Sequence, residues 1–392
     1  MRIVHVLRAP MGGVLRHVRD LARAQAEAGH AVGLVCDVQG TQGYDEAALE
    51  ALAPKLALGL HRVRMARSIG FADIASARKI LKILRRLGPD AVHGHGAKGG
   101  VYARAIGRLA NRNAPPARLY SPHGGSLHYD PESTAGKVYF AIERLLERHC
   151  ETILFVADHE RAAYRAKIGA PRCATRVVHN GLTPAEFTPV LTAPDAADFL
   201  FIGEMRRLKG PDLFVDALAA LSDGGKTSVS AVMVGAGPDR AAIEARIAEA
   251  GLGDVVALRP PMPARAAFAL ARTVVMPSRA EAMPYIVLEA LAAGRPLIAT
   301  DVGGIAEIMG GHGDALIAPT LPDLTAAMAA ALDDPGALGR RMPPVDTLRQ
   351  RFSTAAMAEA ITNACREALL QARKSPDRAV KRAIEPRSSN VS

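Results

Sequence analysis

The chain of 392 residues contains no tryptophan, and only 4% of its residues are aromatic. Proteins that bind nucleic acid stack bases on aromatic side chains, and no nucleic-acid-binding motif occurs here. We therefore expect no nucleic-acid partner, although the formal net charge is +10. The four cysteines are scattered and form no CxxC pair. They are expected to be reduced and mostly buried in a cytoplasmic protein.

Long apolar runs are absent as well. No run of about 18 apolar residues occurs, so no membrane-spanning helix is expected. The opening residues, MRIVHVLRAPMGG, have the pattern of a strand followed by a glycine turn and lack the features of a signal peptide. Apolar residues make up 49% of the chain, which predicts globular domains, and the length is sufficient for two of them.

The positive charge is unevenly distributed. Residues 1–185 hold 27 Lys and Arg against 15 Asp and Glu, a net of +12, and the remainder carries −2. Many of the cations lie in the segments 61–67, 78–86 and 103–112. In RKILKILRR (78–86) they alternate with apolar residues, which predicts an amphipathic helix. Such a helix either lies on an anionic membrane or is an ordinary surface helix with its apolar side in the core.

Short apolar segments alternate with helical patterns and indicate an α/β fold. The strands expected in the first half are 2–7, 31–36, 91–95, 117–121, 152–157 and 175–179. The pattern restarts at 198–204 and continues with 228–237, 254–260, 273–278, 295–300 and 314–319. This repetition predicts two Rossmann-like, doubly wound domains.

The domain limits follow from a Pro-, Thr- and Ala-rich link and from the last helical pattern. We expect an N-terminal domain over 1–185, a second domain over 186–350, a helix over 351–373 and a polar, disordered tail over 374–392. Parallel sheets of this kind bind ligands at the carboxyl ends of their strands. A cleft between the two domains is therefore the expected substrate site.

Glycines follow the first expected strand. Gly12 and Gly13, in PMGGVLRHV, allow close approach of the backbone to a ligand, and the N-terminus of the next helix attracts anions. The alternative is a tight turn with no ligand. In the second half, VGAGPDR places Gly235 and Gly237 after a strand, but the dinucleotide fingerprint is incomplete because Arg240 occupies the third glycine position. We expect these two glycines near a nucleotide base.

A cationic loop and an acidic loop also follow strands of the second half. Arg206, Arg207 and Lys209 precede Gly210 and a helix, which suits a diphosphate, although a basic surface loop is the alternative. In EAMPYIVLE, Glu281 follows a strand and can accept hydrogen bonds from sugar hydroxyls. Glu289 is expected near the N-terminus of a helix. It either binds the two hydroxyls of a ribose or, as a first-turn acid, stabilises the helix dipole.

Histidines occur at several expected strand ends. HGH (93–95) and PHGG (122–125) carry no acidic or cysteine ligands at supporting spacing, so no metal is expected. His123 follows the strand 117–121 and is followed by two glycines. Its position suits a polar group facing a substrate cleft, although a single histidine is more often structural.

Together these motifs resemble those of the retaining glycosyltransferases of family four, which have the GT-B fold. The resemblance rests on GGVLRH, VHGHGAKGG, SPHGG, VVHNGLTPAEF, GEMRRLKG, VGAGPDR and EAMPYIVLEALAAGRPLIATDVGG, in this order, over roughly residues 1–370. The seven residues between Glu281 and Glu289 are its most specific part. The family transfers a sugar from a nucleotide-sugar donor with retention of anomeric configuration and needs no metal or other cofactor. In the family the last helix packs back on the first domain.

The resemblance also implies roles for individual residues. Glu281 would hold the donor sugar, Glu289 the ribose, and Lys209 would neutralise the departing diphosphate. His123 would lie by the sugar near the reacting carbon. Gly12 and Gly13 would line the other wall of the site. Met283, Pro284 and Tyr285 would lie by the sugar and diphosphate and contribute mainly backbone amides. The implied reaction is a front-face attack in which a donor phosphate oxygen takes the proton of the acceptor.

The sequence departs from the family at two places. Glu204 occupies the usual Arg position of the cationic loop, so either Arg206 or Arg207 would supply the phosphate-binding cation. MPY (283–285) replaces the common GFG, which leaves the identity of the donor sugar open.

The sequence therefore predicts a glycosyltransferase that uses a nucleotide-sugar donor, UDP-linked by expectation. The basic first half indicates a glycan or polyprenyl-linked acceptor on an anionic membrane, in the assembly of surface polysaccharide or glycolipid. The expected location is cytoplasmic, on the inner face of the membrane. Two alternatives remain open: an isomerase of the nucleotide-sugar 2-epimerase type, and a non-catalytic module that binds a sugar nucleotide.

Overall fold

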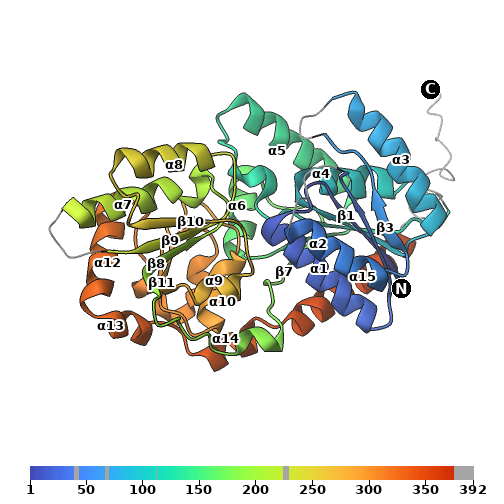
Figure 1. Cartoon of the computed structure of the whole chain (residues 1–392). Helices are drawn as coiled ribbons and strands as arrows, with labels where there is room; N and C mark the ends of the chain where they lie inside the picture. The colour runs from blue at the N-terminus through green and yellow to red at the C-terminus, as the bar shows by residue number, and fades with distance from the viewer. Residues whose placement is uncertain (39–43, 67–69, 112, 224–228, 375–392) are drawn as a thin grey trace, which may run out of the picture. The chain divides into compact units, whose positions relative to one another are not determined.

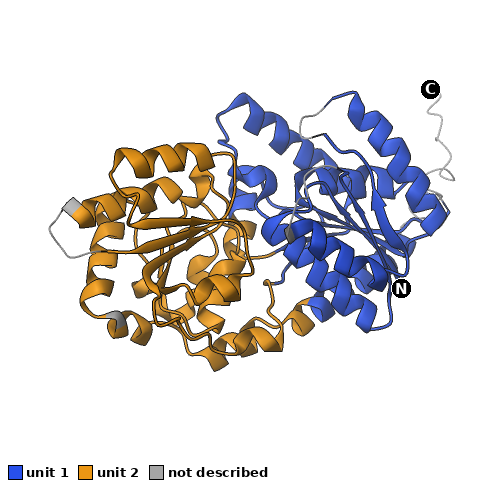
Figure 2. Ribbon diagram, in the orientation of Figure 1, with its two compact units in different colours: residues 1–155, 163–178, 358–392 blue, residues 156–162, 179–357 orange. Residues whose placement is uncertain are grey.

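The computed structural model describes residues 1–38, 44–66, 70–111, 113–223 and 229–374 (Figure 1). The expected disordered tail lies almost entirely outside these residues. The chain divides into two compact units (Figure 2). Unit 1 comprises 1–155, 163–178 and 358–392, and unit 2 comprises 156–162 and 179–357.

Unit 1 is built on a parallel sheet of seven strands in the order β3-β2-β1-β4-β5-β6-β7. The strands are β1 Arg2–Leu7, β2 Ala31–Cys36, β3 Gly59–Arg62, β4 Ala91–His95, β5 Ala117–Ser121, β6 Thr152–Phe155 and β7 Ala174–Val177. Its helices are α1 Gly12–Glu27, α2 Tyr44–Leu52, α3 Ala72–Leu87, α4 Gly96–Val101 and α5 Thr134–Leu146, joined by the last part of α15.

Side-chain alternation along these strands places helices on both faces of the sheet. Val32 and Leu34 pack with Leu15 of α1 on one face, whereas Val35 packs with Ile80 of α3 on the other. Because successive residues of a strand point to opposite faces, the apolar runs of the sequence fill both layers. The doubly wound arrangement predicted for this half is confirmed.

Unit 2 is built on a parallel sheet of five strands in the order β10-β9-β8-β11-β12. The strands are β8 Ala197–Ile202, β9 Ala231–Val234, β10 Val256–Arg259, β11 Ala271–Met276 and β12 Leu297–Ala299. Its helices are α7 Pro211–Asp223, α8 Arg240–Glu249, α9 Ala264–Phe268, α10 Tyr285–Ala292, α11 Ile305–Met309, α12 Leu321–Asp333, α13 Pro335–Arg340 and α14 Val345–Arg351. Helix α10 packs on one face of this sheet, and α7 and α12 pack on the other.

Two helices contain residues of both units. Helix α6, Asp158–Lys167, starts in unit 2 and continues into unit 1. Helix α15, Thr354–Lys374, also starts in unit 2 and belongs to unit 1 from Ala358 onward. Within unit 1, Gln25 of α1 donates a hydrogen bond to the Thr362 hydroxyl of α15 at 3.3 Å.

The structure corrects two expectations for strands. The segment 314–319 was expected to be a strand, but it contributes only an isolated bridge between Ile317 and Thr300. The sequence analysis missed β3, a four-residue edge strand that is only half-buried.

Candidate active site

The carboxyl ends of β8 and β11 mark the point where the sheet of unit 2 reverses its strand order. The chain runs from β8 outward to β9 and β10, and then returns to the other side of β8 to form β11 and β12. The loops after β8 and β11 therefore diverge, and open α/β sheets bind their ligands at such a point. Lys209 lies on the first of these loops and Glu281 on the second.

Lys209 and Glu281 form an ion pair at this point. The Lys209 ammonium lies 2.6 and 2.7 Å from the two carboxylate oxygens of Glu281. The Ser278 hydroxyl donates a further hydrogen bond of 2.8 Å to Glu281. The Glu281 side chain is only 6% exposed, and that of Lys209 is 28% exposed. The two residues that the sequence assigned to sugar and diphosphate are thus brought into direct contact.

The backbone around Glu281 is held by the loop that follows β12. Gly303 has φ of +62°, and a Cβ atom at this residue would lie 1.9 Å from the carbonyl oxygen of Glu281. The Gly304 amide donates to the Ala282 carbonyl at 2.8 Å. Only glycine at position 303 permits this approach, so the DVGG segment fixes the position of the acidic loop.

Met283, Pro284 and Tyr285 lie where the acidic loop enters α10. Pro284 is the N-cap residue and provides no side-chain hydrogen bond to the first turn. The Asn180 side-chain amide donates to the Met283 carbonyl at 2.8 Å, and both residues are buried. Asn180 therefore holds the entry to the helix whose N-terminal amides face the carboxyl edge of the sheet.

Glu289 does not lie where the sequence analysis placed it. Helix α10 begins at Tyr285, so Glu289 is its fifth residue and is 8% exposed. The interaction of an acid with the helix dipole falls off beyond the first turn. The expectation of a first-turn acid is therefore wrong, whereas the assignment to a ribose stays a prediction.

The cationic loop after β8 is tied to the loop after β9. The Arg207 amide donates to Asp239 at 2.6 Å, and the Met205 amide donates to the Ala236 carbonyl at 2.9 Å. Arg206 lies 3.9 Å from Glu204, and both side chains are exposed. Arg206 thus lies beside the acid at the usual Arg position, and the choice between Arg206 and Arg207 as phosphate ligand stays open.

Close packing of two loops explains why positions 235 and 237 are glycines. Added Cβ atoms would lie 1.9 Å from the Gly203 carbonyl and 2.4 Å from the Met205 carbonyl, respectively. Both glycines are thus needed for the loops after β8 and β9 to pack together. Their expected position near a nucleotide base stays a prediction.

In unit 1 the corresponding reversal of strand order lies between β1 and β4. Gly12 and Gly13 open α1 after β1, and the Gly12 amide donates to Asp45 at 3.4 Å. His123 follows β5 and is partly exposed. Its φ of +52° makes it the one non-glycine residue with positive φ in the described part of the chain. Such a conformation persists only where surrounding contacts impose it, and it occurs often at functional sites.

The structure brings His93, His95 and His123 together with two histidines that the sequence analysis did not consider, His5 and His17. Two groups of three have ligand atoms within 4.8 Å of one another: His5, His93 and His95, and His17, His95 and His123. The register explains this, because His5 of β1 pairs with His93 of β4. Alternation of polar residues on two buried strands was the signal that the sequence analysis did not use.

The two cavities described lie elsewhere. One, of about 360 Å³, is lined by Pro89, Asp90 and Pro116, which precede β4 and β5. The other, of about 350 Å³, is lined by residues before β8, β9 and β10. Both lie at the amino ends of the strands. Because parallel sheets bind ligands at the opposite edge, we place the site by its residues and not by these cavities.

Comparison with known proteins identifies the family. The family "Glycosyltransferase Family 4" matches residues 11–186, and "Glycosyl transferases group 1" matches residues 196–334. The chain belongs to this family of glycosyltransferases. The N-terminal match contains Gly12 and His123, and the C-terminal match contains Lys209 and Glu281.

Curated relatives of this glycosyltransferase carry related names. The 2-deoxystreptamine glucosyltransferase of Streptomyces kanamyceticus is 28% identical over 67% of this chain and 73% of its own length. A D-inositol 3-phosphate glycosyltransferase of Kineococcus radiotolerans is 31% identical over 66% of this chain and 65% of its own length. Several other relatives with the second name match over less than half of their length.

Solved structures show that the glycosyltransferase has the GT-B fold. Anabaena Alr3699/HepE, crystallised with UDP-glucose, matches with a TM-score of 0.77 and 16% identity over 94% of this chain and all of that chain. Sucrose-phosphate synthase of Thermosynechococcus elongatus matches with a TM-score of 0.75 and 20% identity over 95% of this chain and all of that chain. At these identities the likeness establishes the fold alone.

Proposed function

We propose that this glycosyltransferase moves a sugar from a UDP-linked donor to an acceptor with retention of anomeric configuration. The contact between Lys209 and Glu281 carries the proposal, because it joins a cation and a hydroxyl-binding carboxylate at the ligand-binding point of one sheet. A donor would exchange this contact for two others. Its diphosphate would face Lys209, and its sugar hydroxyls would donate to Glu281.

The proposed reaction uses Lys209 electrostatically. Negative charge develops on the diphosphate as the bond to the sugar breaks, and a fixed ammonium stabilises that charge more than the ground state. A donor phosphate oxygen takes the proton of the acceptor, which attacks from the face that the diphosphate leaves. His123 lies by the sugar, and Glu289 binds the ribose hydroxyls. The UDP assignment is supported by Anabaena Alr3699/HepE, a protein of the same fold that was crystallised with UDP and with UDP-glucose.

The first prediction concerns the two charged residues. Lys209→Ala and Glu281→Ala should each lower turnover by about 100-fold or more, a typical loss when one electrostatic contact to a transition state is removed. Initial rates with each donor of a panel of UDP-, GDP- and ADP-sugars provide the measurement.

Arg340→Ala is the matched control. Arg340 pairs with Asp334 on the surface of unit 2, and its side chain is 70% exposed. Since Lys209→Ala leaves a buried carboxylate without its cation, melting curves of all three variants should accompany the rates. Near-normal transfer by folded Lys209→Ala and Glu281→Ala proteins would show that these residues do not belong to the active site.

Product analysis separates the alternatives. A 2-epimerase converts the donor without any acceptor, whereas a transferase releases UDP in proportion to the glycosylated acceptor. Binding of the donor with neither conversion nor transfer would identify a non-catalytic module.

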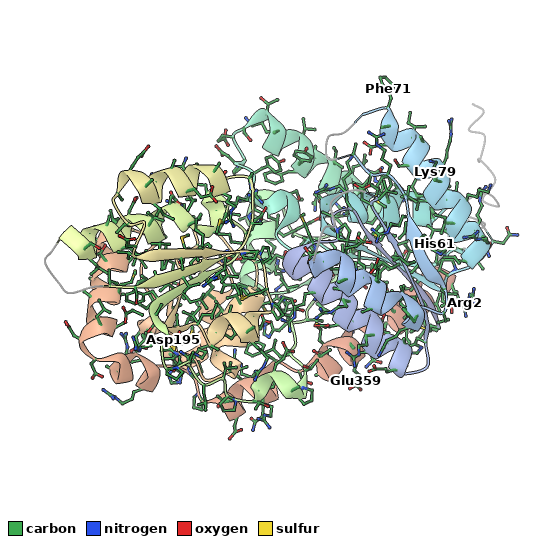
Figure 3. The ribbon with its side chains drawn as sticks, viewed as in Figure 1. Arg2, His61, Phe71, Lys79, Asp195 and Glu359 are labelled. Atoms are coloured by element: carbon green, nitrogen blue, oxygen red, sulfur yellow. The ribbon has the colours of Figure 1, made fainter. Side chains whose placement is uncertain are left out.

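For the acceptor, we propose a glycan or polyprenyl-linked molecule in surface polysaccharide or glycolipid assembly, reached at the cytoplasmic face of an anionic membrane. None of the helices in the described part of the chain is both long and apolar enough to cross a bilayer. Helix α3 supports peripheral contact with an anionic membrane surface. Its apolar residues Ile80 and Leu84 are buried, but Phe71 and Ile74 at its start are 92% and 51% exposed. Figure 3 shows the Phe71 side chain pointing away from the ribbon. The exposed cations Arg78, Lys79, Lys82, Arg85 and Arg86 follow along the same helix.

A further inference from the structure

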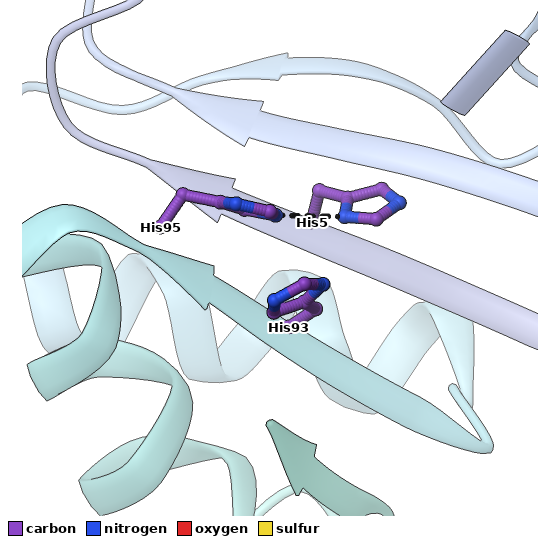
Figure 4. Close-up of side chains that lie close together, drawn as sticks. All are labelled: His5, His93 and His95. Carbon is purple, nitrogen blue, oxygen red and sulfur yellow. Dashed lines mark hydrogen bonds between the residues drawn. The ribbon is translucent and has the colours of Figure 1, made fainter. Parts of the chain in front are cut away.

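A continuous line of hydrogen bonds crosses unit 1 from helix α15 to His123. The bonded side chains, with the distance of each contact, are Thr362 to Gln25 (3.3 Å), Gln25 to His5 (2.9 Å), His5 to His95 (3.0 Å) and His95 to His123 (3.0 Å). Figure 4 shows the His5–His95 contact between neighbouring strands.

The middle of this line is sealed from solvent. His5, Gln25 and His95 are at most 1% exposed, so their polar atoms depend on protein partners. Burial lowers the pKa of His5 to about 4 and holds the pKa of His95 and His123 well below 6.5. The neighbouring histidines lower these pKa values further. All three rings are therefore neutral at pH 7, and a neutral imidazole has one donor and one acceptor nitrogen.

This restriction couples the rings. The Gln25 side-chain oxygen only accepts, so Nε2 of His5 must carry the proton and Nδ1 of His5 must accept. Nδ1 of His5 faces Nε2 of His95, so His95 donates there and accepts at its Nδ1. Nδ1 of His95 faces Nε2 of His123, which must donate. The lone pair of His123 then lies on Nδ1.

We propose that Gln25 is a positioning residue that fixes His123 as the Nε2-protonated tautomer, with Nδ1 as an acceptor for a hydroxyl of the donor sugar. Thr362 supports this arrangement, because its hydroxyl accepts a hydrogen bond from the Gln25 side-chain nitrogen while the amide oxygen of Gln25 faces His5. A reversed amide would reverse the proton on each ring in turn. The part that concerns the donor rests on the proposed function, whereas the tautomer does not.

A metal ion is the competing explanation of the cluster. Both triads contain His95, and both nitrogens of His95 already lie on hydrogen bonds of 3.0 Å. Neither triad includes a carboxylate among the described residues, so none of the protein ligands would neutralise a divalent charge there. The hydrogen-bonded line satisfies the same atoms with no net charge, and it is the arrangement we favour.

The test reads the tautomer directly. The full chain is labelled with ¹⁵N-histidine, and long-range ¹H–¹⁵N spectra at pH 7.5 show which nitrogen of each neutral ring carries the proton; His123→Asn assigns the His123 signals. In the unmodified protein, Nε2 of His123 should be protonated. In Gln25→Met, which has no hydrogen-bonding group, His123 should shift to a mixture of tautomers or to Nδ1 protonation. The proposal is overturned if His123 carries its proton on Nδ1 in the unmodified protein, or if Gln25→Met leaves the tautomer unchanged.

Two smaller substitutions, both at Thr362, test the contact between its hydroxyl and Gln25. Thr362→Val removes the hydroxyl and should loosen the tautomer preference of His123, whereas Thr362→Ser keeps the hydroxyl and should preserve it. If both the Val and Ser variants kept the His123 tautomer of the unmodified protein, the role of the Thr362 hydroxyl in holding the Gln25 amide would be contradicted. If the purified protein contained stoichiometric transition metal, and if its removal changed the histidine signals, the histidines would form a metal site and the proposal would be overturned.

Activity provides the second readout. Gln25→Met and Thr362→Val should lower kcat/KM for the donor by about tenfold, the contribution of one neutral hydrogen bond, and Thr362→Ser should not. A protein that transfers no sugar with any donor would refute the proposed function, yet the spectra would still decide the tautomer. A changed tautomer with unchanged kcat/KM would overturn the role of Nδ1 in donor binding.

Discussion

At the scale of single residues, the site depends on close backbone contacts as much as on charged side chains. Gly303 is the clearest example, because it lets the loop after β12 lie against the carbonyl of Glu281. Because the backbone of Glu281 is held in this way, its carboxylate lies within hydrogen-bonding distance of the Ser278 and Lys209 side chains.

Gly303→Ala should therefore damage the site without touching any charged group. An alanine would combine a positive φ with a Cβ atom 1.9 Å from the Glu281 carbonyl, so the loop must move. We expect a loss of about 1–3 kcal/mol in the free energy of unfolding, and a clear fall in turnover.

Gly311→Ala is the matched control, because nothing lies within 4 Å of a Cβ atom there and its φ is not positive. Urea unfolding and initial rates on both variants provide the measurements. Equal stability and turnover for the two alanine variants would show that the Glu281 loop does not depend on Gly303.

Sequence reasoning located residues by their order along the chain and missed those that depend on the fold. It selected Lys209 and Glu281 because both follow strands, and the structure joins them. It passed over Ser278, whose role depends on a turn that no spacing rule reveals. It also placed Glu289 near the N-terminus of its helix, whereas α10 begins four residues earlier, at Tyr285.

At the scale of elements, buried strands were the easiest to predict. Runs such as RIVHVL are buried on both faces and end in turns, and β1 coincides with the expected 2–7. Strand β3 was not predicted because GLHR is short and polar and lies at the edge of the sheet. The segment 314–319 was misread because its apolar residues pack beside β12, which is itself only three residues long, and form a single bridge.

Helix α3 carries the prediction at this scale. If the exposed cations of α3 bind an anionic surface, Lys79→Gln with Lys82→Gln should weaken binding to phosphatidylserine-containing vesicles by about 25-fold, at about 1 kcal/mol per cation. Phe71→Ser should weaken it further by removing an apolar contact with the interface.

Flotation with anionic and neutral vesicles measures this binding. Arg272→Gln with Arg340→Gln removes the same charge from exposed positions of unit 2 and should leave flotation unchanged. If the unmodified protein shows no preference for anionic vesicles, or if both pairs of substitutions act alike, α3 is not the contact.

At the scale of the whole molecule, the buried histidines make stability depend on pH. His5, His93 and His95 are held neutral, with the pKa of His5 lowered to about 4 and the other two pKa values lowered well below 6.5 by burial. As the pH falls through 6.5 toward 4, the unfolded chain takes up protons that the folded chain does not. Folding stability is therefore lost with falling pH in this window.

We expect the free energy of unfolding of unit 1 to fall by roughly 4 kcal/mol between pH 7.5 and pH 5.5, at about 1.4 kcal/mol per histidine. Hydrogen exchange in urea, read by mass spectrometry on peptides of β1 and β4, measures this change. Peptides of β8 and β11 in unit 2 serve as an internal control. Protection of β1 and β4 that is independent of pH over this range would mean that these histidines are not held neutral by the fold.

Residues 358–374 follow the whole of unit 2 along the chain, yet they belong to unit 1. They bury Ile361, Cys365 and Ala368 and supply the hydroxyl of Thr362 to Gln25. At the usual ~5–20 residues per second, the ribosome needs about 10–35 s to make the stretch 179–357 that comes between. During that time the first 178 residues have left the ribosome, but the helix that completes their core does not yet exist. Until residues 358–374 have been made, the apolar surface of unit 1 that Ile361, Cys365 and Ala368 cover stays exposed.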